Sequence, residues 1–343
     1  MKLAVIPGDG TGPEVIAEGL KALRAVGISF ETVEVDVGAA AYLRTKEAMP
    51  DIALDEIAAC DAVLKGPIGL DARAGEIPPG ILERGIILRL RFELDLYINL
   101  RPVKLLPGVP SVLARGTSEN IDFVVVRENT EGPYAGAGGI LGKGSPHEVA
   151  NQDSINTRHG VERCLRYAFE LAARRRRHLT LVHKANVLTH AGDLWMRAFD
   201  DVAGDFPDVV TAYHHVDAAC LYFVAEPERY DVVVTDNMFG DIITDLGAGI
   251  AGGLGFAASG NLNPDRRSPS MFEPVHGSWP DAAGTGKANP VATILSAAML
   301  CDFLGEQEAA ARMEAAVAAV AGQPFTSTSD VGDRVVSHLR GSA

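Results

Sequence analysis

The stretch LAVIPGDGTGPEVIAEGLKALRAVG, residues 3–27, decides the fold class of this chain. It opens with four apolar residues, as a short buried strand does, and a glycine-rich turn follows at residues 7–12. Apolar side chains then recur with helical spacing at Ile16, Leu20, Leu23 and Val26. The segment therefore predicts a strand, a tight turn and a helix.

Similar units follow along the chain. A helix is expected to end near Cys60, and a strand is expected at residues 62–64. Four later β-branched runs end in charged or polar residues: IDFVVVREN, LTLVHKANV, VVTAYHHVDAA and YDVVVTDNMFGD. Helical patterns occur at residues 161–175, 194–202, 291–304 and 309–320. Strands that alternate with helices predict an α/β fold with a largely parallel, helix-covered sheet.

The composition is that of an ordinary globular protein with a large core. The chain has 343 residues, of which 47% are hydrophobic and 22% charged, and this length fits two domains or two lobes. The formal net charge of −14 disfavours nucleic acid and membrane surfaces as partners, since both are anionic. An enzyme this acidic needs a local cluster of arginines or a cation to bind an anionic substrate.

Cysteine usage and the first residues point to the cytoplasm. The cysteines, Cys60, Cys164, Cys220 and Cys301, are far apart and form no CxxC pair. A disulfide framework or a zinc site is therefore not expected, and reduced, packed thiols are. The apolar run at the N-terminus is too short for a signal peptide.

The PGDGTG turn is a poor dinucleotide-binding fingerprint. Its glycines follow the pattern G-x-G-x-G rather than G-x-G-x-x-G, and no acidic residue follows clearly at the required distance. A tight strand-to-helix turn is the preferred interpretation, so no classical Rossmann fingerprint is expected.

Polar side chains gather where the predicted strands end. Arg127, Lys184, Asp217 and Asp236 all lie at or just after the end of a strand. Ligands of helix-covered sheets bind at the carboxyl ends of the strands. This shared placement predicts a single site.

The segment VTDNMFGDIITDLGAG suggests a cation site. If a helix begins near Gly240, Asp241 and Asp245 are four residues apart and share one face. Two such carboxylates repel each other unless a hard cation such as Mg²⁺ or Mn²⁺ lies between them. The alternative is that one aspartate caps the helix and the other is solvated.

Basic residues suit a carboxylate substrate. Arg91, Arg101 and Arg127 can each bind a carboxylate through two hydrogen bonds, although surface ion pairs are the plainer alternative. Lys184, followed by Asn186, comes after an apolar strand and is a candidate for proton transfer beside a metal. The alternative for Lys184 is an ordinary surface lysine.

The segment MFEPVHGSWPDAAGTGKANP, residues 271–290, predicts a structured loop. Its glycines free backbone amides which, with Asp281, can hold an adenosine ribose and its phosphates. A purely structural loop is the alternative.

Taken together, these strings resemble the isocitrate and isopropylmalate dehydrogenase family of β-decarboxylating dehydrogenases. The resemblance covers nearly the whole chain, from IPGDGTGPEV through LRPVKLLPG, VRENTEGPYAG, HKANVL, TDNMFGDIITDL and EPVHGSWPD to KANP. So many strings in one order are highly specific.

The resemblance implies a role for each matching residue. Arg91, Arg101 and Arg127 match the clamp for the malate carboxylates, and Tyr134 matches the residue that protonates the enolate. Asp241 and Asp245 match metal ligands of one subunit, whereas Asp217 and Lys184 match a ligand and a proton acceptor from the partner subunit. Residues on the NAD side are Asn186, near the nicotinamide, and His276, Gly277, Asp281 and Asn289, near the adenosine.

The same resemblance implies an obligate homodimer with shared active sites, NAD as cofactor, and Mg²⁺ or Mn²⁺. NAD is favoured over NADP because Asp281 repels a 2′-phosphate. The expected fold has two lobes, residues 1–98 plus 252–343 and residues 99–251, and an interlocking arm near residues 136–144. The first lobe carries the cofactor loop, and the second carries the substrate, metal and dimer contacts.

The helix GILERGIILRLR is expected to select the substrate. Ile87 and Leu88 lie one turn before Arg91 and form an apolar wall that suits an isopropyl group. We therefore expect 3-isopropylmalate, and hence leucine biosynthesis. D-malate, tartrate or another substituted malate remains the alternative, because relatives acting on them share an apolar helix.

Two further points stay open. Trp279 stands where a small residue is usual in the family, so it either stacks near the adenine, narrows the cofactor loop or replaces a packing residue. A non-catalytic regulatory subunit is a minor alternative. Such subunits often lose the metal-binding or tyrosine residues, whereas this chain retains them.

Overall fold

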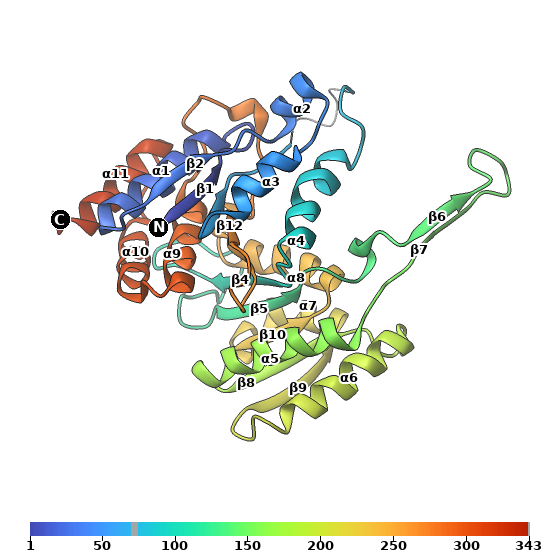
Figure 1. Ribbon diagram of the computed structural model, residues 1–343. Helices are drawn as coiled ribbons and strands as arrows, with labels where there is room; N and C mark the ends of the chain where they lie inside the picture. Colours follow the sequence, from blue (N-terminus) through green and yellow to red (C-terminus); the bar gives the residue numbers. More distant parts are fainter. Residues whose placement is uncertain (70–74, 342–343) are drawn as a thin grey trace.

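The computed structural model describes residues 1–69 and 75–341, which form a ten-stranded mixed sheet covered by helices (Figure 1). The strand order is β2-β1-β3-β12-β11-β4-β5-β10-β8-β9. The predicted α/β class with a largely parallel sheet is confirmed. None of the helices in the described part of the chain is long and apolar enough to cross a membrane.

The sheet is built from β1 (Lys2–Ile6), β2 (Glu31–Glu34), β3 (Ala62–Lys65), β4 (Ile98–Lys104), β5 (Asp122–Glu128), β8 (His178–His183), β9 (Val210–His215), β10 (Val232–Thr235), β11 (Ala258–Leu262) and β12 (Ser270–Pro274). The α-helices are α1 (Gly12–Val26), α2 (Ala39–Thr45), α3 (Asp51–Ala58), α4 (Arg89–Glu93), α5 (Arg158–Arg174), α6 (Thr189–Ala203), α7 (Val216–Ala225), α8 (Asn237–Ile250), α9 (Val291–Leu304), α10 (Gln307–Val320) and α11 (Thr328–Leu339). A π-helical turn, η2 (Glu83–Leu88), leads directly into α4.

Three antiparallel pairings at the centre of the sheet divide it into two parallel halves. β2, β1, β3 and β12 run parallel, as do β5, β10, β8 and β9. β11 pairs antiparallel with both β12 and β4, and β4 pairs antiparallel with β5. Because three reversals separate the halves, their strands point in opposite directions.

The strand order also sorts the chain into segments. The first five strands in the sheet come from residues 2–65 and 258–274, and the other five come from residues 98–235. β11 and β4 join the two groups. The expected lobe boundaries at residues 98 and 252 stay a prediction.

Strand β1 is buried on both of its faces. Leu3 and Val5 of β1 belong to the larger hydrophobic core, whereas Ala4 and Ile6 belong to a smaller core on the opposite face. Figure 1 shows α1, α9, α10 and α11 grouped together, with α2, α3 and α4 gathered separately. Strands covered on both faces are apolar at every position, as the opening sequence predicts.

The PGDGTG turn braces a distant loop. Gly10 has φ +60°, and a Cβ there would lie 2.0 Å from the carbonyl oxygen of Ser278. Thr11 donates to that same oxygen from its backbone N–H, at 2.8 Å, and from its hydroxyl, at 3.1 Å. These contacts fit the tight turn that was preferred from the sequence.

A hairpin projects from the body of the molecule in Figure 1. Its strands, β6 (Gly138–Leu141) and β7 (Val149–Gln152), pair only with each other in the described structure. Ile140, Leu141 and Val149 are 56%, 74% and 57% exposed. Two-stranded hairpins are marginally stable alone, and this one exposes apolar side chains on both of its strands.

Candidate active site

Three arginines are buried together beside the central strands. Arg91 lies on α4, Arg101 on β4 and Arg127 near the end of β5, and all three are buried. The surface ion pairs considered as an alternative are therefore wrong for these residues. Burial, followed by the charge of Arg127, lowers the pKa of both Arg91 and Arg101 to about 10. Such a cluster is prepared to receive an anion.

Arg91 has an unmet hydrogen-bonding requirement. Its Nε is fully buried and has no hydrogen-bond partner among the described residues. An unsatisfied buried donor is costly, and an anionic substrate can satisfy it. This nitrogen is therefore free to bind an anion.

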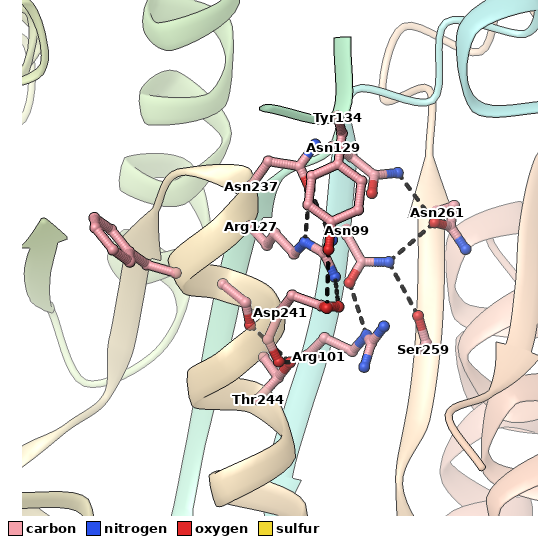
Figure 2. Close-up of polar contacts among 12 residues, drawn as sticks. Asn99, Arg101, Arg127, Asn129, Tyr134, Asn237, Asp241, Thr244, Ser259 and Asn261 are labelled. Atoms are coloured by element: carbon pink, nitrogen blue, oxygen red, sulfur yellow. Dashed lines mark hydrogen bonds and ion pairs between the residues drawn. The ribbon is translucent and has the colours of Figure 1, made fainter. Parts of the chain in front are cut away.

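Helix α8 holds Arg127 in place (Figure 2). The Nε and Nη2 atoms of Arg127 donate to Oδ1 of Asn237 at 3.0 and 2.7 Å, and Nη1 forms an ion pair with Asp241. α8 begins at Asn237, three residues earlier than expected, because Oδ1 of Asp236 caps it by accepting from Phe239 N at 2.7 Å. The cap of this helix is therefore Asp236, not Asp241 or Asp245.

Tyr134 lies beside the same carboxylate. Its hydroxyl donates to Oδ2 of Asp241 at 2.9 Å, and its ring centre is 5.2 Å from the guanidinium carbon of Arg127. Burial raises the pKa of Tyr134, with a further increase from Asp241 that the positive charge of Arg127 opposes. The phenol is therefore protonated at neutral pH and is available as a proton donor.

Asp241 and Asp245 lie one turn apart on α8. Burial, followed by the negative charge of Asp241, raises the pKa of Asp245. Burial opposes ionisation of Asp241 as well, but Arg127 and the Tyr134 hydroxyl hold its pKa below the usual value. A cation between the two carboxylates would relieve their repulsion, so this pair fits a divalent ion.

Lys184 and Asp217 form a separate pair. Nζ of Lys184 lies 2.6 Å from Oδ1 of Asp217, and this ion pair lowers the pKa of the carboxylate. Within residues 1–69 and 75–341, no three acidic, histidine or cysteine side chains are grouped closely enough to hold a metal. One chain therefore does not bring Asp217 to Asp241 and Asp245.

The expected cofactor residues lie on or near the 276–290 loop, apart from Asn186, which is exposed after β8. Gly277 and Asp281 are exposed. Nδ1 of His276 lies 3.0 Å from the carbonyl oxygen of Gly277, whereas its buried Nε2 has no partner in the described structure. Asn289 accepts from Val291 N at 3.0 Å and so helps to start α9. The unpartnered Nε2 of His276 and the exposed carboxylate of Asp281 are both available to hydrogen-bond a nucleotide.

Trp279 is 53% exposed and has φ +41°. It therefore does not lie in either hydrophobic core of the described residues. The short 3₁₀ turn that follows, Pro280–Ala282, begins at its neighbour Pro280 and contains Asp281. The indole is left available on the surface of the loop.

Ile87 and Leu88 end the π-helical turn before α4. Both are half-buried, and neither is packed against either hydrophobic core of the described residues. π-helical turns inside helices are rare and are frequent at functional sites. The two side chains are therefore free to line a binding pocket.

Sequence reasoning missed a buried polar network next to Arg101. Asn99 and Asn261 are fully buried, as are Ser259 and Asn129, and Lys65 and Glu273 are nearly so. The only sequence signal was a polar residue inside an apolar strand, as in YINLRPV and ASGNL. A polar residue in a strand is normally expected to face solvent, and the sequence alone does not show that these strands are buried on both faces.

Comparisons with known proteins agree with these observations. The profile of the isocitrate/isopropylmalate dehydrogenase family matches residues 2–339. A relative from Frankia casuarinae named 3-isopropylmalate dehydrogenase is 58% identical, and the match covers 99% of this chain and 100% of the relative. A protein of the same name from Corynebacterium glutamicum (strain ATCC 13032) is 55% identical, with 99% and 100% covered.

Solved structures give the same result. The crystal structure of isocitrate dehydrogenase from Methylococcus capsulatus superposes with a TM-score of 0.89 at 36% identity, covering 99% of each chain. Residues 2–339 carry the family's sequence profile, and the fold matches a family member over its full length. The chain belongs to the isocitrate/isopropylmalate dehydrogenase family.

Proposed function

We propose that this chain is the catalytic subunit of a homodimeric, cytoplasmic dehydrogenase that oxidises and decarboxylates 3-isopropylmalate with NAD⁺ and Mg²⁺ or Mn²⁺. The observation that carries the proposal is the buried cluster of Arg91, Arg101 and Arg127 next to a helix that offers Ile87 and Leu88. A malate with an apolar C3 substituent matches both features. The names of the relatives from Frankia and Corynebacterium support the same substrate.

Each group of side chains has a separate task in this reaction. The arginines bind the two carboxylates of the substrate, and the unsatisfied Nε of Arg91 gains a partner. Lys184 of the partner subunit accepts the proton of the C2 hydroxyl as hydride leaves for NAD⁺. Tyr134, held protonated by its raised pKa, donates a proton to C3 after CO₂ has left.

The metal is proposed at Asp241, Asp245 and the partner subunit's Asp217. When bound, a divalent ion supplies Lewis-acid polarisation of the substrate oxygens. Asp241 is now paired with Arg127 and Tyr134, so its oxygens must be shared or released as the ion binds. Asp217 is exposed on its own chain, which suits a ligand that reaches into another subunit.

NAD is proposed on the 276–290 loop. Burial lowers the pKa of His276, so its imidazole is neutral and Nε2 is available to the adenine ring. Asp281 is exposed and accepts hydrogen bonds from a ribose 2′-OH, but its charge repels a 2′-phosphate. Asn186 is proposed near the nicotinamide, and Gly277 and Asn289 on the adenosine side.

The homodimer is supported by exposed apolar side chains on neighbouring elements. Leu221 and Val224 of α7 are 63% and 46% exposed, and Met238 and Ile242 of α8 are 46% and 53% exposed. α7 and α8 are in contact and carry Asp217, Asp241 and Asp245. A symmetric contact through these helices covers the apolar surface and brings Asp217 of one subunit toward the carboxylates of the other.

The test is NADH formation with Mg²⁺ or Mn²⁺ and, in turn, 3-isopropylmalate, D-malate, tartrate and isocitrate. We expect kcat/KM for 3-isopropylmalate to exceed the others by at least ~10-fold, a difference of ~1.4 kcal/mol. A preference for any other substrate in this panel would overturn the substrate assignment and leave the family unchanged.

The apolar wall is tested by Leu88→Ser. Burying an isopropyl group contributes ~2 kcal/mol, so this variant should lose up to about 30-fold in kcat/KM for 3-isopropylmalate. D-malate lacks the isopropyl group and serves as the matched control, with little change expected. An equal loss for both substrates would mean that Leu88 does not contact the C3 substituent.

A further inference from the structure

A series of buried side chains connects Arg101 to Glu273, just before the cofactor loop, and Figure 2 shows its first part, from Arg101 through Asn99 to Asn261. Nε of Arg101 donates to Oδ1 of Asn99 at 2.7 Å, and Nδ2 of Asn99 donates to Oδ1 of Asn261 at 3.0 Å. Nδ2 of Asn261 in turn donates to Oε1 of Glu273 at 2.7 Å. Oε2 of Glu273 lies 2.5 Å from Nζ of Lys65. This series of side chains crosses four adjacent strands of the sheet, β4, β11, β12 and β3.

Each amide in this chain has only one workable orientation. Oδ1 of Asn261 accepts from Asn99 and from Asn129, both at 3.0 Å, while its Nδ2 faces the ionised carboxylate of Glu273. A flipped Asn261 would set its oxygen against that carboxylate and turn its NH₂ group toward the two amide donors. Asn99 is fixed likewise, because Nδ2 also donates to Ser259 Oγ at 3.1 Å and Oδ1 must face Arg101.

The ionised state of Glu273 anchors the series. Burial favours its neutral form, but Lys65 and Arg91 outweigh this and lower its pKa to about 2. Glu273 is followed by Pro274, Val275 and His276, so this carboxylate lies just before the cofactor loop. Lys65 also donates to the carbonyl oxygen of Gly66 at 3.0 Å, next to the loop that supports the PGDGTG turn.

Among the described residues, the hydrogen bond to Asn99 is the one that fixes Arg101. Its terminal nitrogens form no hydrogen bond with any side chain or carbonyl within residues 1–69 and 75–341, and Nε is held by Asn99 alone. A buried guanidinium that is fixed at Nε presents both terminal nitrogens in one plane, as a carboxylate requires.

We propose that Asn99 and Asn261 are positioning residues that orient the guanidinium of Arg101 toward the substrate carboxylate. They also fix the distance between this guanidinium and Glu273, which lies just before the cofactor loop. This inference rests on the proposed role of Arg101 in binding a malate carboxylate. Both act through Arg101: Asn99 accepts from its Nε, and Asn261 orients Asn99.

The experiment measures the steady-state kinetics of Asn99→Ala with whichever substrate of the panel the wild-type enzyme turns over best. The substrate assignment and this inference can therefore fail separately. Losing a hydrogen bond to a charged donor should raise KM for that substrate about 10- to 100-fold. The change in kcat should be smaller, and KM for NAD⁺ should stay within about 2-fold of wild type.

A double-mutant cycle tells positioning from general structural damage. Because Asn99 acts through Arg101, Asn99→Ala should add almost nothing to the KM increase already caused by Arg101→Ala. The same cycle is run with the milder Asn99→Ser and with Asn261→Ser, so the test does not depend on one variant folding. Additive effects in these cycles would overturn the proposal.

Asn263→Ala is the matched control. Asn263 is also buried, and its Nδ2 donates to the carbonyl oxygen of Asp95 at 3.1 Å, without any contact to Arg101. It should lower thermal stability yet leave KM near wild type. A KM increase as large as that of Asn99→Ala would show that any lost buried amide has this effect and would overturn the proposal.

Discussion

Gly240 is the residue at which α8 comes closest to Arg127. A Cβ at this position would lie 2.4 Å from Cγ and 2.7 Å from Cβ of Arg127, which is buried and cannot move aside. The glycine in TDNMFGD therefore lets the helix press Asn237 and Asp241 against the guanidinium.

We predict that Gly240→Ala lowers the free energy of unfolding by about 1–3 kcal/mol and abolishes most activity. Gly249→Ala is the matched control, since it lies on the same helix with nothing within 4 Å of its added Cβ. It should be neutral, or stabilise the helix by up to about 1 kcal/mol. Urea unfolding of both variants checks this, and equal stability of the two would contradict the close approach.

Glu273 makes a pH-dependent contribution to stability. Its pKa in the folded state is about 2, against 4.5 for a free glutamate, because Lys65 and Arg91 outweigh burial. A depressed acid pKa gives stability that is complete above about pH 4.5 and is lost as the pH falls toward 2.

We predict that Glu273→Gln has a shallower loss of unfolding free energy than wild type between about pH 4.5 and 3. At pH 7 it should be less stable by about 3 kcal/mol, since Lys65 is left buried without its carboxylate. The exposed Glu119→Gln is the control and should follow the wild-type curve. Parallel curves for wild type and Glu273→Gln would contradict the assigned pKa.

Much of the candidate site could be predicted at the residue scale, but not its supporting layer. Arg127, Tyr134 and Asp241 were named from motifs, and the structure brings them into contact. Asn99 and Asn261 were missed because each bonds to a residue that is distant in sequence or on another strand. A single sequence shows which side chains are polar, but it does not show which of them meet inside the protein.

At the scale of elements, helices were predicted more closely than the order of strands. α9 coincides with the expected residues 291–304, because its apolar run ends at a left-handed glycine, Gly305. The antiparallel pairings of β4 and β11 were not predicted. Strand direction depends on which distant strands become neighbours, and local periodicity contains no such information.

The hairpin of β6 and β7 gives a prediction at this scale. Replacing Ile140 and Leu141 with serine should leave the circular dichroism of the fold unchanged, since both side chains are exposed in the single chain. The double variant should dissociate to monomers at concentrations where wild type is dimeric, with a parallel loss of activity. Light scattering after size exclusion measures this, with Lys143→Ser at the hairpin tip as control. A fully active dimeric variant would refute a role for the hairpin in assembly.

At the scale of the whole molecule, the side chains proposed for catalysis form two separate groups within one chain. Tyr134, Asp241 and Asp245 gather with the arginines, whereas Lys184 and Asp217 pair with each other. The central claim is therefore that each active site is completed by the partner subunit.

Hybrid dimers test this claim most directly. Differently tagged Lys184→Ala and Asp241→Asn chains, each inactive alone, are co-expressed and the mixed dimer is purified. If Lys184 and Asp217 cross to the partner's site, each mixed dimer retains one intact site and about half of wild-type activity. Mixing Lys184→Ala with Asp217→Asn is the control and should restore none, because both changes fall on the donated set. An inactive Lys184→Ala/Asp241→Asn dimer would show that each site is built within one chain and would contradict the account.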